Sequence, residues 1–252
     1  MRYEVIDSHC HLDFPKFNRD RDKTIERAKI NGVVGMINSG IDYRTNANSL
    51  DLARKYDFIH ATLGLSPQMV PDANDGKIKQ ILSQMERNIG KAVGIGEAGL
   101  DYYYCRTAAG RKRQEDVFSQ VIELADRYNK TLVIHGRDGE ELALKMSRDL
   151  DRVIFHCYGG SLETMHKIVD AGHYVSVPTL VCFSESHKAI AQNLPLENML
   201  IETDSPYLSP RKGRNEPTFV RDSVPVIAQL KEVDETEIAM ATIQNTRRAF
   251  EL

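Results

Sequence analysis

Eight short apolar runs alternate along this 252-residue chain with segments of helical period, and this alternation limits the fold more than any other feature. Several runs are apolar at almost every position, as strands buried on both faces of a parallel sheet should be. Eight such strands joined by helical crossovers predict an α/β fold of the (β/α)8 barrel type. The runs are 3–9, 33–40, 58–64, 91–97, 131–135, 152–157, 173–179 and 198–204.

The segments between the runs predict helices, and residues 1–252 are expected to form a single domain. The last helix is expected to begin at Asp234, with Glu237 completing a capping box. Pro225 is expected to kink or interrupt the segment that follows Pro217. An open doubly wound sheet is the alternative, but no GxGxxG motif opens a helix. Apolar residues at helical spacing are Ile78, Ile81, Leu82 and Met85, then Val117, Val121, Ile122 and Ala125, then Leu162, Met165, Ile168 and Val169.

The composition is that of a soluble globular protein, with 41% apolar and 27% charged residues. No apolar run is long enough to span a bilayer, and the first residues, MRYEVIDS, lack a signal-peptide pattern. Four cysteines without a CxxC motif indicate free thiols in a reducing compartment, so a cytoplasmic location is expected. A net charge of −3 provides no global basic field for nucleic acid.

Histidines and carboxylates end five of the predicted strands, and the C-terminal strand ends of a barrel converge on one mouth. Four imidazoles and two carboxylates are too many for one tetrahedral zinc and enough for a binuclear site, in which Glu97 can bridge. Mixed nitrogen and oxygen ligands suit zinc, magnesium or manganese and disfavour calcium. The candidate metal ligands are His9, His11, Glu97, His135, His156 and Asp204.

The remaining histidines are given ordinary structural roles. His166 and His187 fall in helical segments and are expected to be solvated, whereas His60 and His173 begin strands. The cysteines are interpreted as small buried apolar residues.

Six motifs in chain order, DSHCHLD, GEAGLDY, VIHGRD, FHCYGG, ETDSP and RNEP, resemble those of TatD-type metal-dependent deoxyribonucleases, a branch of the amidohydrolase-like barrels. The motifs run from residue 7 to residue 217, so the resemblance covers nearly the whole chain. It implies hydrolysis of phosphodiesters in DNA, or alternatively RNA, often by trimming from the 3′ end. It implies two divalent metal ions that share Glu97, one also held by His9, His11 and Asp204, the other by His135 and His156.

One position departs from the family pattern. The family usually has GxHP after the third strand, and this chain has Gly-Leu-Ser-Pro, so Ser66 occupies the position of the family histidine. This change is expected to weaken contact with the phosphate and to leave the metal site intact.

The catalytic residues predicted are Asp204, as the base that takes a proton from water, and Glu97. Arg137 is expected to contact the phosphate, because it lies two residues beyond His135. Ser66, Tyr102, Lys212 and Asn215 are further candidates for substrate binding, with Tyr102, Tyr103 and Tyr104 available to stack bases or to pack their loop. The basic residues near the mouth, which could instead be solvated, are Arg106, Arg111, Lys112, Arg113, Arg211, Lys212 and Arg214.

Two other functions stay open. An amidase, lactonase or deacylase could use the same barrel, for example on aminoacyl-tRNA, although no lysine ends a strand to be carboxylated as a metal bridge. A metal-bound scaffold that lost activity with the GxHP histidine is the non-catalytic alternative. No obligate protein partner is expected, and the chain is predicted to be a monomer or a weak oligomer.

Overall fold

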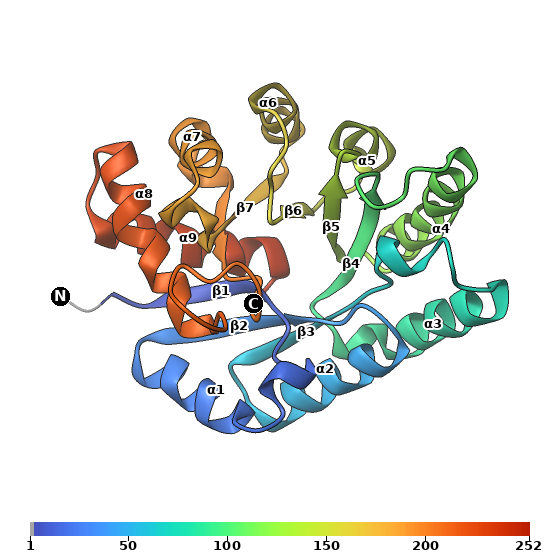
Figure 1. The fold of residues 1–252 in the computed structure, drawn as a ribbon, viewed down its shortest axis with the longest axis horizontal. Helices are drawn as coiled ribbons and strands as arrows, with labels where there is room; N and C mark the ends of the chain where they lie inside the picture. The colour runs from blue at the N-terminus through green and yellow to red at the C-terminus, as the bar shows by residue number, and fades with distance from the viewer. Residues whose placement is uncertain (1–2) are drawn as a thin grey trace.

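Eight parallel strands form one sheet in the order of the sequence, and the computed structural model describes residues 3–252 (Figure 1). Each strand pairs in parallel with the next along the chain, which is the strand order of a (β/α)8 barrel. The strands are β1 (Val5–Cys10), β2 (Val33–Ser39), β3 (Ile59–Leu63), β4 (Gly94–Asp101), β5 (Thr131–Arg137), β6 (Val153–His156), β7 (Tyr174–Pro178) and β8 (Met199–Glu202).

Helices α1 to α8 form a ring outside the strands (Figure 1). Their buried residues face the sheet, as an amphipathic helix requires. The helices are α1 (Arg21–Ile30), α2 (Tyr43–Lys55), α3 (Asp75–Asn88), α4 (Ala108–Arg127), α5 (Glu140–Ser147), α6 (Leu162–Asp170), α7 (Glu185–Asn193), α8 (Ser223–Lys231) and α9 (Glu235–Phe250). No helix among residues 3–252 is long and apolar enough to cross a membrane.

The last strand returns to the first through the segment that follows β8. The Asp204 amide donates to the His9 carbonyl at 3.0 Å, and the His11 amide donates to the Ser205 carbonyl at 2.8 Å. Cys10 and Ser205 form a parallel bridge between these two hydrogen bonds. The predicted (β/α)8 barrel is therefore confirmed, and its closure brings three of the predicted metal ligands together through backbone contacts.

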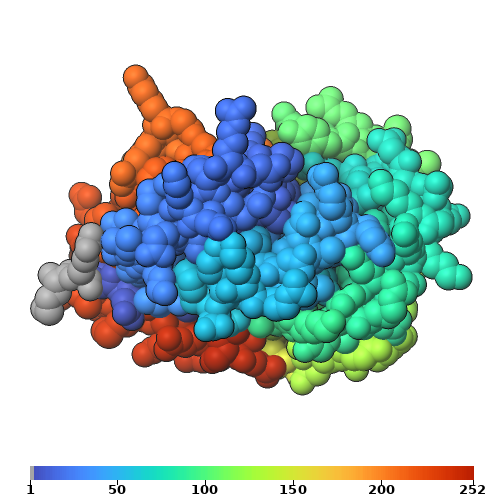
Figure 2. All heavy atoms as spheres, turned by 90° about the horizontal axis from the view of Figure 1, so that it is seen from below, coloured from blue at the N-terminus to red at the C-terminus, as the bar shows by residue number. Residues whose placement is uncertain are grey.

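Helix α9 closes the opposite, N-terminal end of the barrel. Ala249 and Phe250 pack with residues from β2, β5, β6 and β8 in a small apolar cluster. In Figure 2 the orange segment after β8 and a blue N-terminal segment project from one edge, and the red C-terminal helix lies along the other. Only one end of the barrel thus stays open, which is the end to which the strands carry their C-terminal residues.

Three local expectations differ from the structure. Strand β4 runs on to Asp101, so Glu97 lies within the strand and not at its end. The side chain of Asp234 makes no capping hydrogen bond, and the Glu237 amide is instead paired with the Asp234 carbonyl at 3.0 Å. Pro225 lies in the first turn of α8, where no helical partner for its nitrogen is needed, and a 3-10 helix that ends at residue 222 precedes it.

Candidate metal centre

His9, in β1, and His11, directly after β1, face each other at the open end. Their Nε2 atoms are 3.2 Å apart, and both rings are held from behind by β2. Nδ1 of His11 donates to the Ser39 carbonyl at 2.8 Å, and Nδ1 of His9 is 3.2 Å from the Ser39 hydroxyl. Such contacts fix the orientation of an imidazole and leave Nε2 free for a metal.

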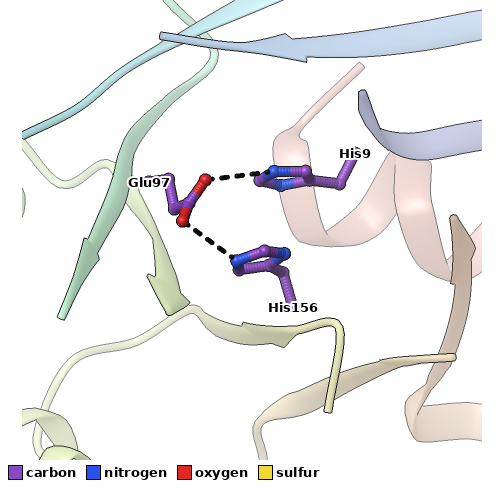
Figure 3. A group of neighbouring side chains, drawn as sticks. All are labelled: His9, Glu97 and His156. Atoms are coloured by element: carbon purple, nitrogen blue, oxygen red, sulfur yellow. Dashed lines mark ion pairs between the residues drawn. The ribbon is translucent and has the colours of Figure 1, made fainter. Parts of the chain in front are cut away.

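Glu97 lies between the two halves of the candidate centre, with one oxygen toward each half (Figure 3). Its Oε2 is 3.5 Å from Nε2 of His9 and 3.4 Å from Nε2 of His11. Its Oε1 is 2.8 Å from Nδ1 of His135 and 3.5 Å from Nε2 of His156. This is the arrangement that a bridging carboxylate needs.

A register shift in β4 directs Glu97 into the mouth. The shift falls between Ile95 and Ala98, where the strand has an extra residue relative to β5, and such bulges re-aim side chains. Gly96 and Gly99 flank Glu97 with φ of +130° and +146°, a conformation that L side chains rarely adopt. A Cβ at Gly99 would overlap the His135 carbonyl, so glycine permits the close approach of β4 and β5.

Asp204 completes the first half of the centre from the segment after β8. Its Oδ1 is 3.5 Å from Nε2 of His11 and 4.0 Å from Nε2 of His9. Its side chain is 16% exposed against 9% for Glu97, so Asp204 is the carboxylate more open to water. Two groups have ligand atoms close enough for one ion: His9 with Glu97 and His156, and His9 with His11 and Asp204.

The donor set fits divalent ions. Ligand atoms about 2.1 Å from a tetrahedral zinc lie roughly 3.4 Å apart, which matches most of the nitrogen and oxygen separations in this cluster. All six predicted ligands converge here, which agrees with the sequence expectation about their position. Their division between two ions remains a prediction.

Two further carboxylates support the histidines, and sequence reasoning did not single them out. Asp101 Oδ2 lies 3.1 Å from Nε2 of His135 on the side away from Glu97. Glu202, at the end of β8, is fully buried and places Oε1 3.5 Å from Nδ1 of His156. Neither Glu202 oxygen has a hydrogen-bond partner among the described residues. The sequence does offer one indication of their role, because Asp101 belongs to the motif GEAGLDY and Glu202 to the motif ETDSP.

The carboxylates hold protons on several of the imidazoles. Burial lowers the pKa of His135 and of His156, but Asp101 and Glu97 raise the first to about 9, and Glu97 and Glu202 raise the second to about 10. Burial opposes ionisation of Glu97, yet the surrounding histidines keep its pKa well below the usual range. Burial lowers the pKa of His9, so this ring is neutral. Metal ions must therefore displace protons to bind.

A cavity of about 780 Å³ opens over the cluster and is lined by Glu97, Asp204 and three of the four ligand histidines. Ser66 and Arg137 line it as well, as expected for residues that contact substrate. Two larger grooves, of about 1090 and 920 Å³, lie between α5 and α6 and between α3 and α4, and contain none of the six ligands. We call the cavity over the ligands the mouth cavity.

Three candidate substrate residues do not line the mouth cavity. Tyr102 turns toward α4, where its hydroxyl donates to Glu115 at 2.8 Å. Asn215 is fully buried, and its amide donates to the Thr203 carbonyl at 2.8 Å, so it anchors the loop after β8. Lys212 is exposed on that loop. The structure therefore gives these three predictions no support.

Most of the basic residues near the mouth are paired with protein groups. Arg111, Lys112 and Arg113 belong to α4 rather than to a loop, and the last two contact Asp116 and Asp75. The other pairs are Arg111 with the Cys105 carbonyl, Arg211 with Asp222, and Arg214 with Asp20 and Glu216.

His187 was expected to be solvated, and this expectation is wrong. It lies in the first turn of α7, is partly buried and lines the mouth cavity. In the sequence, His187 is indistinguishable from an exposed residue of a helix. Its contact with the mouth cavity depends on how α7 packs against the barrel. His166 is exposed on α6, as expected.

Comparison with known proteins identifies the family. A family model described as TatD related DNase matches residues 6–251. The chain belongs to the TatD-related DNase family. It is 38% identical over 248 residues to an uncharacterized metal-dependent hydrolase, MJ1582, of Methanocaldococcus jannaschii, and the alignment covers 98% of this chain and 97% of that protein.

Two further members of the family extend the comparison. Human deoxyribonuclease TATDN3 is 30% identical, with 98% of this chain and 94% of that protein covered. The crystal structure of YjjV, a TatD homolog from Escherichia coli, superposes with a TM-score of 0.90 at 29% identity and covers all of both chains. The resemblance drawn from the six motifs is confirmed.

Proposed function

We propose that this chain is a metal-dependent hydrolase of phosphodiesters in DNA that trims strands from the 3′ end, with RNA as an alternative substrate. The observation that supports this most is Glu97, which places one carboxylate oxygen toward each of two ligand groups within an open cavity. The family and the name of the human relative support DNA as the substrate.

The rim of the mouth cavity offers two aromatic surfaces that suit unpaired bases. Tyr103 and Tyr104 follow β4, and the Arg137 guanidinium lies 3.9 Å and 5.1 Å from their ring centroids. Phe14 and Tyr207 lie in edge contact at the β1 and β8 side of the barrel, with their ring centroids 6.2 Å apart. Because β4 and β8 are on opposite sides of the barrel, a nucleic-acid strand that crosses the cavity can stack a base on each surface.

Divalent ions held by the six ligands supply Lewis acidity and lower the pKa of water. Glu97 stays ionised and fixes the two ligand groups relative to each other. Asp204 orients the attacking water and takes its proton as the water oxygen bonds to phosphorus and the bond to the leaving oxygen breaks. Arg137 stabilises the charge on the phosphate oxygens from the rim.

The test uses purified protein, stripped with chelator and reloaded with zinc, manganese or magnesium. Oligonucleotides labelled at the 5′ or the 3′ end, single- or double-stranded, report both the cleavage and its direction. We expect metal-dependent shortening from the 3′ end, and elemental analysis should find more than one divalent ion per chain at saturation. Saturation at one ion, unaffected by His135→Ala and His156→Ala, would contradict the binuclear site.

A deacylase that acts on esters, such as aminoacyl-tRNA, is the second candidate. It is favoured by the ion pairs of Arg113, Arg211 and Arg214, because these pairs leave few free cations near the mouth and cleavage of a terminal ester requires only the end of the substrate in the mouth cavity. Release of the amino acid from aminoacyl-tRNA without shortening of any oligonucleotide would support it.

A further inference from the structure

Four histidines line the mouth cavity among the described residues, and the proposed chemistry uses only three of them. His11, His135 and His156 are candidate metal ligands, and the fourth is His187 from α7. His187 enters from the β7 side of the barrel, whereas Ser66 enters from the β3 side. The cavity thus has an imidazole on its rim even though Ser66 occupies the position of the family histidine.

The ring of His187 is held on one side by the cap of its own helix. Ser184 is the N-cap of α7, and its Oγ lies 2.8 Å from Nδ1 of His187. The same oxygen accepts the His187 backbone amide at 3.5 Å. The Ser186 hydroxyl lies 3.0 Å from the Ser184 hydroxyl and 3.4 Å from Nδ1, so two hydroxyls are placed to donate to Nδ1. An Nδ1 that accepts a hydroxyl proton leaves the hydrogen of the neutral ring on Nε2.

The other side of the ring faces the cavity. A Cβ built on Gly159 would lie 3.8 Å from Nε2, and Gly159, in the turn after β6, also lines the cavity. No described residue forms a hydrogen bond with this Nε2, and it is not among the buried atoms that lack a partner. Burial lowers the pKa of His187, so the ring is neutral near pH 7. In the tautomer in which Nδ1 accepts a hydroxyl proton, Nε2 is an N–H donor directed at a space that the described residues do not fill.

We propose that His187 binds the substrate by donating a hydrogen bond from Nε2 to a non-bridging phosphate oxygen. The proposal rests on the function proposed above, because it needs a phosphodiester in the mouth cavity. His187 contributes the neutral donor at the β7 side, and Arg137 contributes positive charge at the β5 side. The two donors from different strands fix the phosphate without a histidine at position 66.

Two substitutions separate the two ring nitrogens. His187→Asn keeps a polar group near Nδ1, where it can still contact Ser184, and removes the donor near Nε2. His187→Gln keeps an amide near the position of Nε2. His166→Asn, on the exposed face of α6, is the matched control. The probes are a 5′-fluorescein oligonucleotide and bis(4-nitrophenyl) phosphate, and metal content and Tm are measured for each variant.

We expect His187→Asn to lose about ten- to a hundredfold in kcat/KM, as for a hydrogen bond to a charged group. His187→Gln should lose less, and His166→Asn should stay within about twofold. Metal content and Tm should match the wild type in all three variants.

Three results would overturn the proposal. Equal rates for the wild type and His187→Asn would show that Nε2 does not contact the phosphate. A loss of rate that follows a loss of metal or a lower Tm would assign His187 a structural role. If the wild type cleaves neither probe with any metal, the proposed function itself is wrong. If the wild type is active and His187→Asn cleaves at the same rate, only the inference about His187 is wrong.

Discussion

Asp204 differs from the other candidate ligands in its access to water. Its side chain is more exposed than that of Glu97, and only one of its oxygens faces the histidines within 4 Å. Burial raises the pKa of Asp204, but His11 and the neighbouring histidines lower it further, so the carboxylate is ionised and able to accept a proton.

Asp204→Asn should therefore reduce turnover by about 10²- to 10⁴-fold, the usual cost of removing a general base. Metal affinity should fall much less, because an amide oxygen can still act as a ligand. The measurement is kcat beside metal content from elemental analysis, with Asp57→Asn on the exposed surface as the control. Near-normal turnover in metal-loaded Asp204→Asn would remove Asp204 from the mechanism.

The convergence of the six candidate ligands could be predicted from the sequence because each lies at or near the C-terminal end of an apolar run. Asp101, Glu202 and His187 were missed for a physical reason. Asp101 and Glu202 contact histidines on other strands, and His187 reaches the cavity only through the packing of α7, so none of these contacts can be read from a single apolar run. Ser66 could be recognised only against the family pattern.

The second prediction concerns Ser66. Among residues 3–252, its Oγ accepts only the Gln68 amide, at a long 3.4 Å, and the side chain lines the mouth cavity. Ser66→His should raise DNA cleavage about ten- to a hundredfold without changing metal stoichiometry, because an imidazole can reach a phosphate oxygen that the hydroxyl cannot.

Ser66→Ala is the matched comparison, since it removes the hydroxyl without adding a donor, and it should not raise kcat/KM. If Ser66→His leaves cleavage unchanged or lowers it, the cavity is shaped around serine. A phosphoester other than DNA, or a substrate without phosphate, would then be the better candidate.

Strand β4 contributes both the central carboxylate of the candidate centre and a carboxylate that supports one of its histidines. It carries Glu97, and Asp101 at its end contacts His135 on the next strand. Its apolar run could be predicted, but its extension to Asp101 could not, because the register shift depends on pairing with β5. Likewise, the sequence pattern predicts a capping box at Asp234, but the Asp234 side chain makes no capping hydrogen bond at the start of α9.

Gly99→Ala tests this element. A Cβ there would overlap the His135 carbonyl at a backbone conformation that alanine rarely adopts. We expect a loss of at least about 1–3 kcal/mol in the free energy of unfolding, together with weaker metal binding, because Glu97 and His135 must separate.

Gly90→Ala provides the control, since a Cβ at Gly90 would meet nothing within 4 Å. Its stability should stay within about 0.5 kcal/mol of the wild type in urea unfolding. Equal midpoints for the two variants would mean that β4 can shift away from β5 without cost.

At the scale of the whole molecule, the first and last strands of the barrel meet at the candidate metal centre. The segment after β8 pairs with the end of β1 through two backbone hydrogen bonds, and the ligands come from β1, β4, β5, β6 and this segment. Alternating apolar and helical segments predict parallel strands joined by helices, and eight such strands favour a barrel, whose sequential strand order the structure then shows. A metal ion that joins the strands should therefore stabilise the fold as a unit.

That stabilisation should depend on pH in a defined direction. The raised pKa values of His135 and His156, about 9 and about 10, mean that the metal-free fold gains stability from their protonated forms. This gain is complete below about pH 6.5, the pKa of an unfolded histidine, and is lost as the pH rises through 9 to 10. Metal binding needs the neutral rings, so a falling pH weakens the metal-bound form relative to the metal-free form.

The difference in Tm between metal-loaded and chelator-treated protein should consequently grow from pH 6.5 to pH 8.5. Metal at about 100 times its Kd adds about 2.7 kcal/mol, which is roughly 5–10 °C for a chain of this size. Differential scanning calorimetry at constant total metal measures the shift, and calorimetric titration in buffers of different ionisation enthalpy counts the protons released. A pH-independent difference in Tm with no proton release would show that the ions bind away from His135 and His156, because binding at these rings must displace their protons.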